Sequence, residues 1–97
     1  MYLDRGVSEM KFQQLECLAA IADTGSFHSA ADKLGYSQQL ICHHIEQLEQ
    51  ELGHSLIQLE GTMVYLTKEG QKAVRHGREI LKSRDALYAE LDMNIEY

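Results

Sequence analysis

The chain has 97 residues, of which 44% are hydrophobic and 25% are charged, and its formal net charge is −6. This length fits a single domain, because two halves would each be too small to bury a core. The composition is that of a globular protein, and no apolar run approaches the roughly 20 residues that span a bilayer. The start of the chain lacks the pattern of a signal peptide, so we expect a cytoplasmic protein with no membrane partner.

Three helices are predicted in the first half of the chain. Residues 12–22 carry apolar side chains at spacings of three and four, and a glycine follows shortly after them. Ser26 and Ser37 are suitable N-cap residues for two further helices, over residues 27–34 and about 38–52. The side chains expected to face inward are Phe12, Leu15, Leu18, Ala19, Ala22, Ala30, Ala31, Leu34, Leu40, Ile41, Ile45, Leu48 and Leu52.

A change of period follows the third predicted helix. Residues 56–59 and 63–66 are short β-prone runs on either side of a turn, which predicts a β-hairpin. Thr67 can then cap a long helix that runs from residue 68 to about residue 93. The order of these elements is typical of a winged helix-turn-helix with an added helix.

The expected fold is therefore mainly α. We assign residues 11–67 to a winged helix-turn-helix domain of three helices and a short β-hairpin wing, and residues 68–97 to a long linker and dimerisation helix. Residues 1–10 show no pattern and are expected to form a frayed N-terminal arm.

An apolar stripe runs along the predicted long helix with a seven-residue repeat. Such a stripe is longer than the core of one small domain can cover, and its spacing is that of a helix that pairs with another helix. We therefore expect a homodimer. Its expected interface consists of Val74, Ile80, Leu81, Leu87, Tyr88 and Leu91.

The acidic charge is concentrated in the middle of the chain. Residues 12–67 contain one base, Lys33, and seven acidic residues, which is a balance of −6 for this segment. The bases nearest to it lie early in the predicted long helix, at Lys68, Lys72, Arg75 and Arg78. On charge alone, this is a poor binder of nucleic acids.

The order and spacing of the residues nevertheless match a DNA-binding module. From Lys11 onward the chain resembles the N-terminal domain of LysR-type transcriptional regulators. The matching residues are Gln14-Leu15, Gly25-Ser26-Phe27, Ala30-Ala31, Leu34, Ser37-Gln38, Ile45, Leu48-Glu49, Leu52-Gly53, Leu56, Leu66-Thr67 and Gly70.

The resemblance implies a dimer that places helix 38–52 in the major groove of double-stranded DNA, with the hairpin as a wing beside the minor groove. It also implies antiparallel pairing of the long helices. The family continues into an effector-binding domain that has no counterpart in these 97 residues, so we expect no small-molecule effector on this chain.

The chain departs from the family pattern in the predicted recognition helix. The family helix opens with Ser-Gln, then usually a small residue and Ala or Pro, whereas this chain has Gln39 and Leu40 after Gln38. A family serine that donates to a phosphate is matched by Cys42, a weaker donor. The next position, often arginine in the family, is His43.

The predicted wing departs further. Both arginine positions of the family's wing motif are lost, to Leu59 and Thr62, and Glu60 adds a negative charge between them. Because each phosphate contact releases counterions, these losses weaken the part of the affinity that is independent of DNA sequence.

Several side chains are candidates for DNA contact. Gln38 and Gln39 can bond to adenine in the major groove, or can simply be exposed polar residues. His43 and His44 can contact a phosphate or a guanine edge when protonated, or stay neutral at the surface. The full candidate set is Ser26, Lys33, Ser37, Gln38, Gln39, Cys42, His43, His44 and Thr62.

Other chemistry finds little support. No two of the five histidines have the i, i+4 spacing of a helical zinc pair, so we expect no metal and no cofactor. The sequence contains no glycine-rich phosphate loop and no nucleophile with a placed base, so we expect no enzyme. Cys42 is either a redox-sensitive thiol or an unreactive one, and Cys17 is expected to pack as a small apolar residue.

Two functional hypotheses remain. In the first, the chain is a dimeric DNA-binding transcriptional regulator of the LysR type. In the second, it is an acidic relative that no longer binds DNA and acts through proteins, as an antagonist or a heterodimer partner of another regulator. The motif spacing favours the first hypothesis, and the charge of residues 12–67 favours the second.

Overall fold

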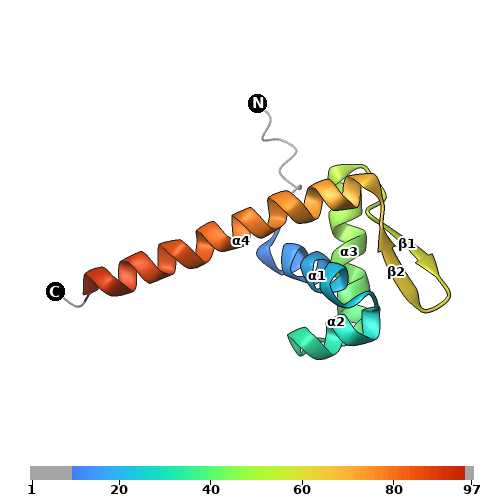
Figure 1. Cartoon of the computed structure of the whole chain (residues 1–97), viewed down its shortest axis with the longest axis horizontal. Helices are drawn as coiled ribbons and strands as arrows, with labels where there is room; N and C mark the ends of the chain where they lie inside the picture. The colour runs from blue at the N-terminus through green and yellow to red at the C-terminus, as the bar shows by residue number, and fades with distance from the viewer. Residues whose placement is uncertain (1–9, 96–97) are drawn as a thin grey trace.

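The computed structural model describes residues 10–95, with side chains up to residue 92, so the expected N-terminal arm lies outside it except for Met10. Three helices are followed by a β-hairpin and a long helix (Figure 1). The elements are α1 (Phe12–Thr24), α2 (Phe27–Leu34), α3 (Gln38–Leu52), β1 (Ile57–Glu60), β2 (Met63–Leu66) and α4 (Lys68–Ile95). The predicted winged helix-turn-helix with an added long helix is confirmed.

Local signals determine where the helices begin and end. Hydroxyl oxygens cap α2, α3 and α4 by accepting a hydrogen bond from the backbone N–H three residues later, at 2.9–3.1 Å. The three capping residues are Ser26, Ser37 and Thr67. Each of the first three helices is followed by a glycine in the left-handed conformation, which a residue with a Cβ rarely adopts.

The core is built around α1, which packs against α2, α3 and α4. Contact on several sides gives α1 a wider buried face than a single stripe, so the predicted inward set for this helix is partly wrong. Phe12 is 46% exposed and Ala19 and Ala22 are only half-buried, whereas Ile21 is fully buried. Cys17 is also fully buried, as expected from the sequence. In α3, the predicted inward residues Leu40 and Leu52 are exposed at the surface. The other predicted core residues of α3 are buried: Ile41, Ile45 and Leu48.

The wing is a two-stranded antiparallel hairpin in which Gln58 lies opposite Tyr65. Its base is attached to the domain through Val64, whose side chain is buried and whose N–H donates to the carbonyl oxygen of Gly25 at 2.9 Å. The turn between α1 and α2 therefore lies directly beside β2.

The junction between α3, the wing and α4 is centred on Leu56. The carboxylate of Glu49 accepts from the N–H of Leu56 at 2.8 Å, and the carbonyl oxygen of Leu56 accepts from the N–H of Thr67 at 3.0 Å. A Cβ atom built on Gly70 would overlap this same carbonyl group. We call this set of contacts, formed by Glu49, Leu56, Thr67 and Gly70, the Leu56 junction.

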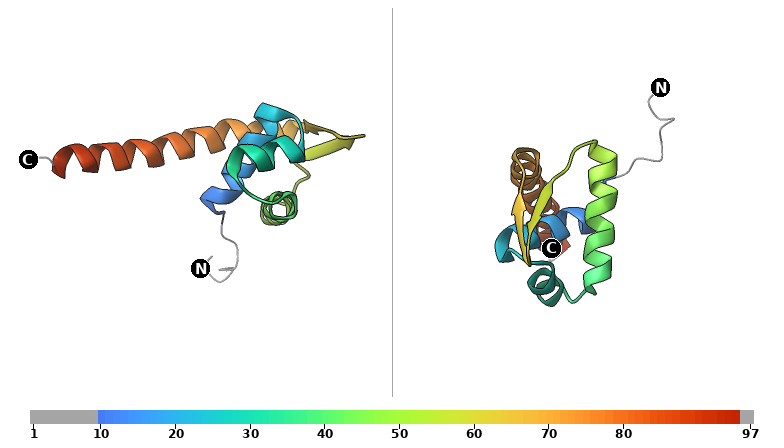
Figure 2. Two further views of the ribbon diagram at one scale, coloured as in Figure 1. Left: turned by 90° about the horizontal axis from the view of Figure 1, so that it is seen from below. Right: turned by 90° about the vertical axis from the view of Figure 1, so that its right-hand side faces the viewer.

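The long helix α4 contributes to the core only over its first half. Val74 lies in the core, and Gly77 packs against the side chain of Leu15. Beyond Arg84, which still contacts α1, the helix extends away from the other elements, so that its end lies far from the wing (Figure 2). Within the described residues, no helix is long and apolar enough to cross a membrane.

Replacing Gly70 by alanine should destabilise the domain. Alanine favours a helix by about 1 kcal/mol over glycine, but here its Cβ would collide with the Leu56 backbone, and such overpacking costs about 2 kcal/mol or more. Gly77→Ala is the matched control, because its Cβ would meet only the flexible side chain of Leu15 at 3.3 Å. Urea denaturation should show a clear loss for Gly70→Ala and a change within about 1 kcal/mol for Gly77→Ala. Equal effects of the two variants would contradict the role of the Leu56 junction.

Candidate nucleic-acid interface

The exposed face of α3 carries three of the nine predicted DNA-contact residues. The opposite side of the helix is held by the buried residues of the core, which keeps the helix in a fixed orientation. Gln38, Gln39 and His43 are exposed on the outward side, and Glu46 follows one turn after His43. The first two turns of α3 therefore present amide and imidazole groups to solvent, and an acidic residue lies directly after them.

Both serines of the candidate set, Ser26 and Ser37, are N-caps of helices. The side-chain oxygens of Ser26 and Ser37 accept from backbone N–H groups at 2.9 and 3.1 Å. A hydroxyl that accepts in this way can still donate its own hydrogen to an anion. Because the N-termini of helices also favour negative charge, both ends offer suitable surroundings for a phosphate.

The two adjacent histidines have different surroundings. His43 is exposed, whereas His44 is partly buried, and its buried Nδ1 atom has no hydrogen-bond partner among the described residues. The ring of His44 lies 6.1 Å from that of Tyr36, measured between centroids. Burial, followed by the nearby His43 and Lys11, lowers the pKa of His44 and so favours its neutral form. His43 is the more accessible residue of the pair.

The two thiols are both disfavoured as thiolates. Burial, with a contribution from Glu16, raises the pKa of Cys17 to about 12. Burial also raises the pKa of Cys42, and the negative charge of Glu46 adds to this effect. Reactive cysteines need electropositive surroundings, so the position of Cys42 favours the interpretation as an unreactive thiol.

The single base of residues 12–67 is engaged within the domain. The ammonium group of Lys33 lies 3.0 Å from Oδ2 of Asp23, while the guanidinium of Arg78 lies 2.6 Å from Oδ1 of the same carboxylate. Asp23 thus joins α1 to both α2 and α4. All three side chains are about half exposed, so these ion pairs are screened by solvent.

The wing carries no basic side chain. Thr62 lies in the turn between β1 and β2, with Leu59 and Glu60 before it, and all three are exposed. The hairpin therefore presents an apolar side chain and a hydroxyl at the two arginine positions of the family pattern, with the carboxylate of Glu60 between them.

The predicted dimer interface on α4 is divided by the structure. Val74 is only 6% exposed and packs in the core, so its assignment to the interface was wrong. The heptad pattern could not separate it, because the first half of α4 contributes to the core with the same helical spacing. Ile80 and Leu81 are partly buried against the core. The three remaining residues of the predicted set are 50–63% exposed: Leu87, Tyr88 and Leu91.

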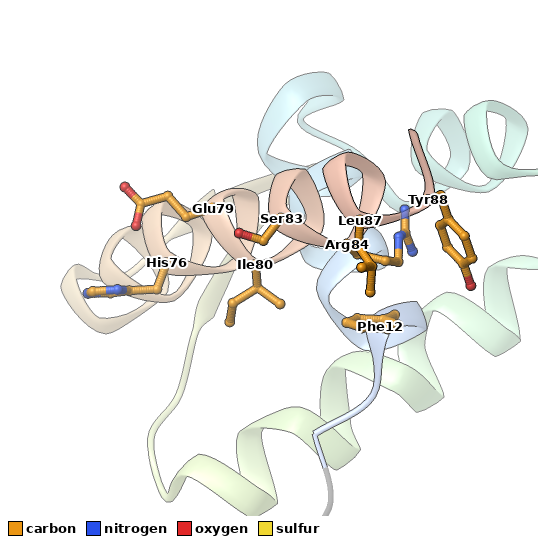
Figure 3. A pocket seen from close by; sticks show the side chains of 8 residues that line it. All are labelled: Phe12, His76, Glu79, Ile80, Ser83, Arg84, Leu87 and Tyr88. Carbon is orange, nitrogen blue, oxygen red and sulfur yellow. The ribbon is translucent and has the colours of Figure 1, made fainter. Parts of the chain in front are cut away.

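A groove of about 580 Å³ lies beside these exposed residues, between α4 and the start of α1. Figure 3 shows Phe12 below α4, with Leu87, Tyr88 and Ile80 on the helix above it. The guanidinium of Arg84 lies 5.2 Å from the centroid of the Phe12 ring and is 3.0 Å from the Glu16 carboxylate. This cation–π contact and ion pair attach the outer part of α4 to α1.

Sequence reasoning missed one contact at the tip of α3. The side-chain nitrogen of Gln38 lies 3.2 Å from Nδ1 of His28 in α2, and Nε2 of His28 lies 3.4 Å from Asp32. The i, i+4 spacing of His28 and Asp32 was visible in the sequence, but their proximity to Gln38 depends on how α2 crosses α3. Within the described part of the chain, no three potential metal ligands gather into a metal site.

The fold and the exposed helix define a winged helix-turn-helix protein, and comparisons with known proteins identify its family. Residues 12–71 match the family described as bacterial regulatory helix-turn-helix protein, lysR family. The chain belongs to this family. Because the family consists of transcriptional regulators, the prediction that the chain is not an enzyme is confirmed.

Solved structures agree with this assignment. The protein chain of the CbnR_DBD–DNA complex superposes on this chain with a TM-score of 0.83 at 28% sequence identity. The superposition covers 88% of this chain and 98% of the CbnR chain. The protein chain of the BenM_DBD complex with catB site 1 DNA gives a TM-score of 0.82 at 28% sequence identity. This superposition covers 87% of this chain and 94% of the BenM chain.

Curated relatives are regulators of greater length. The transcriptional activator CmpR of Synechocystis sp. is 36% identical over 74 residues, which is 76% of this chain and 24% of the relative. The transcriptional regulator CzcR of Bacillus thuringiensis is 36% identical over 80 residues, which is 82% of this chain and 27% of the relative. The chain thus spans about a quarter of the length of these two relatives.

Alkylation should distinguish the two thiols. In the folded protein at neutral pH, Cys17 should stay unmodified by iodoacetamide, and Cys42 should react slowly because its raised pKa leaves little thiolate. Glu46→Gln removes a negative charge, so it should lower the pKa of Cys42 and speed its reaction. Glu60→Gln, in the wing, removes an equal charge and should leave the rate unchanged. A rate at Cys42 that is insensitive to Glu46 would contradict this account.

Proposed function

We propose that this chain binds double-stranded DNA as a transcriptional regulator, with the first two turns of α3 in the major groove. The observation that carries the proposal is the exposed N-terminal half of α3, which presents Gln38, Gln39 and His43 while its other face is buried in the core. Glutamine and histidine side chains can bond to base edges. In this arrangement Ser37 and Cys42 lie beside the phosphate backbone.

The turn between α1 and α2 supplies a second contact region. Ser26 caps α2 there, and the same turn is hydrogen-bonded to β2 of the wing. We infer that Ser26 and Thr62 contact the backbone on either side of the groove that α3 enters. Lys33 contributes only when its ammonium group leaves Asp23. His44 contributes little because it is partly buried and its lowered pKa favours the neutral form.

We further propose that the protein is a homodimer in which the exposed half of α4 pairs with that of a second copy. The exposed apolar residues Leu87, Tyr88 and Leu91 continue along the groove that Phe12 lines. A contiguous apolar surface of this kind is unfavourable in water and is typical of an interface. This arrangement gives the two recognition helices that a two-fold symmetric DNA site requires.

A second candidate function is supported by the electrostatics. Residues 12–67 have a balance of −6, their one base is paired with Asp23, and the exposed carboxylates of Glu46 and Glu60 lie on α3 and on the wing. Phosphates are repelled by such a surface. In this alternative the chain pairs through α4 with another regulator and blocks it without binding DNA.

DNA binding at several salt concentrations separates these functions. We expect the protein to bind a fragment from upstream of its own gene at low salt, with a shallow dependence of log affinity on log salt because the wing provides few phosphate contacts. The double variant Leu59→Arg/Thr62→Arg should bind more tightly, and its slope should be steeper by up to about 2. The control Gln58→Arg/Tyr65→Arg adds the same charge within the strands, where a smaller change is expected.

The outcomes differ for each candidate. Failure of the wild-type chain to bind any DNA at low salt would exclude the DNA-binding function and favour the protein-binding alternative. Tight wild-type binding with an unchanged slope in the wing variant would move the phosphate contacts from the wing to the bases Lys68, Lys72, Arg75 and Arg78.

Two exposed leucines of α4 test the dimer. Leu87→Asp/Leu91→Asp should give a monomer, because two carboxylates would have to be buried against the partner. Ala86→Asp/Ala89→Asp is the matched control, since the helical period places these exposed residues on the other side of α4. Light scattering at micromolar concentration should report a dimer for the wild type and the control. A dimer in the leucine variant would place the interface elsewhere.

A further inference from the structure

The tip of α3 is connected to α2 by a chain of polar contacts. Gln38, the first residue of α3, has its Nε2 atom 3.2 Å from Nδ1 of His28. On the other side of the same ring, Nε2 of His28 lies 3.4 Å from Oδ2 of Asp32. The side chains of His28 and Asp32 are 71% and 73% exposed, so the whole chain of contacts lies on the surface that the proposed function places against DNA.

The chemistry of these three groups determines one direction of hydrogen bonding. The amide nitrogen of Gln38 carries only donors, so Nδ1 of a neutral His28 must accept from it. The ring proton then resides on Nε2, which lies 3.4 Å from Oδ2 of Asp32, and the negative charge of that carboxylate favours a proton at this position. Asp32 therefore selects the tautomer of His28, and His28 in turn selects the orientation of the Gln38 amide.

The remaining hydrogen-bonding capacity of Gln38 is consequently defined. One N–H group is used by His28, which leaves one N–H donor and the oxygen Oε1 free. A donor beside an acceptor matches adenine, which offers N7 as an acceptor and the N6 amino group as a donor in the major groove. In the opposite orientation the amide oxygen would face His28, and both donors would point away from it.

We propose that His28 is a positioning residue, which holds the Gln38 amide in the orientation that selects adenine at one position of the DNA site. This inference rests on the proposed function of α3. A free glutamine side chain loses conformational entropy when it binds a base. Because the hydrogen bond to His28 already restricts the Gln38 side chain before DNA binds, less entropy is lost on binding. Exclusion of water by DNA strengthens the hydrogen bond between Gln38 and His28 and the attraction between His28 and Asp32.

The test is the base preference at each position of the DNA site. Binding sites for the wild type are selected from random duplexes, and relative affinities are then measured on single-base variants of the selected site. Gln38→Ala identifies the position that Gln38 contacts. At that position His28→Ala should reduce the discrimination for adenine over the other bases by about fivefold, which is the lower end of what one bidentate contact provides. Discrimination at the other positions should not change.

Three further variants separate positioning from a structural role. His28→Asn should restore the preference, because the Asn oxygen can accept from Gln38 in place of Nδ1. Asp32→Ala should cause a smaller loss than His28→Ala, since it removes only the selection of the tautomer. His54→Ala, at an exposed histidine in the turn after α3, is the matched control and should leave the profile unchanged. The thermal midpoints of all variants should agree with that of the wild type.

The results that overturn the inference are distinct from those that overturn the proposed function. If the wild type selects no DNA sequence, both fail. If Gln38→Ala loses its preference for one base while His28→Ala keeps the wild-type profile, the inference fails and the proposed function stands. A uniform loss of affinity in His28→Ala at every position also overturns it, because that result assigns to His28 a general effect on folding or charge.

Discussion

The arrangement of the whole molecule depends on the two backbone hydrogen bonds of Leu56. Its N–H donates to the Glu49 carboxylate at the end of α3, and its carbonyl oxygen accepts from Thr67 at the start of α4. Three elements therefore take their directions from one residue. The absence of a Cβ on Gly70 allows α4 to approach this carbonyl group closely. Glu49, Leu56, Thr67 and Gly70 are all among the residues by which the sequence resembles the family, so the resemblance and the junction involve the same positions.

The Leu56 junction is separate from the outward face of α3 and from the wing, so these surfaces can vary independently of the fold. Gln39, Cys42 and Leu59 depart from the family pattern, but none of them contributes a hydrogen bond to the junction. Side chains on the outward face of α3 and on the wing can thus change without loss of the domain. What such changes alter is the charge of this surface, and here the balance of residues 12–67 is acidic. The same scaffold is compatible with a weakly salt-dependent DNA binder or with a regulator that acts on proteins.

Much of the fold could be predicted because its signals are local. The caps Ser26 and Ser37, with a glycine after each helix, placed α2 and α3 at the observed residues. Non-local contacts could not be predicted in the same way. The burial of Gln14 and Ile21 in α1 follows from the packing of three other helices around it. Val74 has the same helical spacing as the exposed residues of α4, so periodicity alone could not separate buried from exposed apolar residues.

The electrostatic features of the candidate site likewise divide into those that the sequence shows directly and those that depend on non-local contacts. The shortage of bases in residues 12–67 was evident from the sequence, as was the loss of arginine from the wing. The pairing of Lys33 and Arg78 with one carboxylate was not evident from the sequence, because Asp23, Lys33 and Arg78 lie on three different helices. The contact of Gln38 with His28 was missed for the same reason, since it depends on the crossing of α2 over α3.

The continuity of α4 makes it a rigid lever. Its 28 residues give a length of about 42 Å, and its first half cannot rotate independently of the domain because Val74 and Gly77 are packed within it. A tilt of about 10° at one end of such an arm displaces the other end by about 7 Å, which is roughly two base-pair steps of DNA. In a dimer built on α4, the crossing angle of the two helices would therefore set the separation of the half-sites that the two copies of α3 can reach together. Small changes in that crossing angle would therefore change the operator spacing that the dimer selects, while the base contacts of each copy of α3 stay the same.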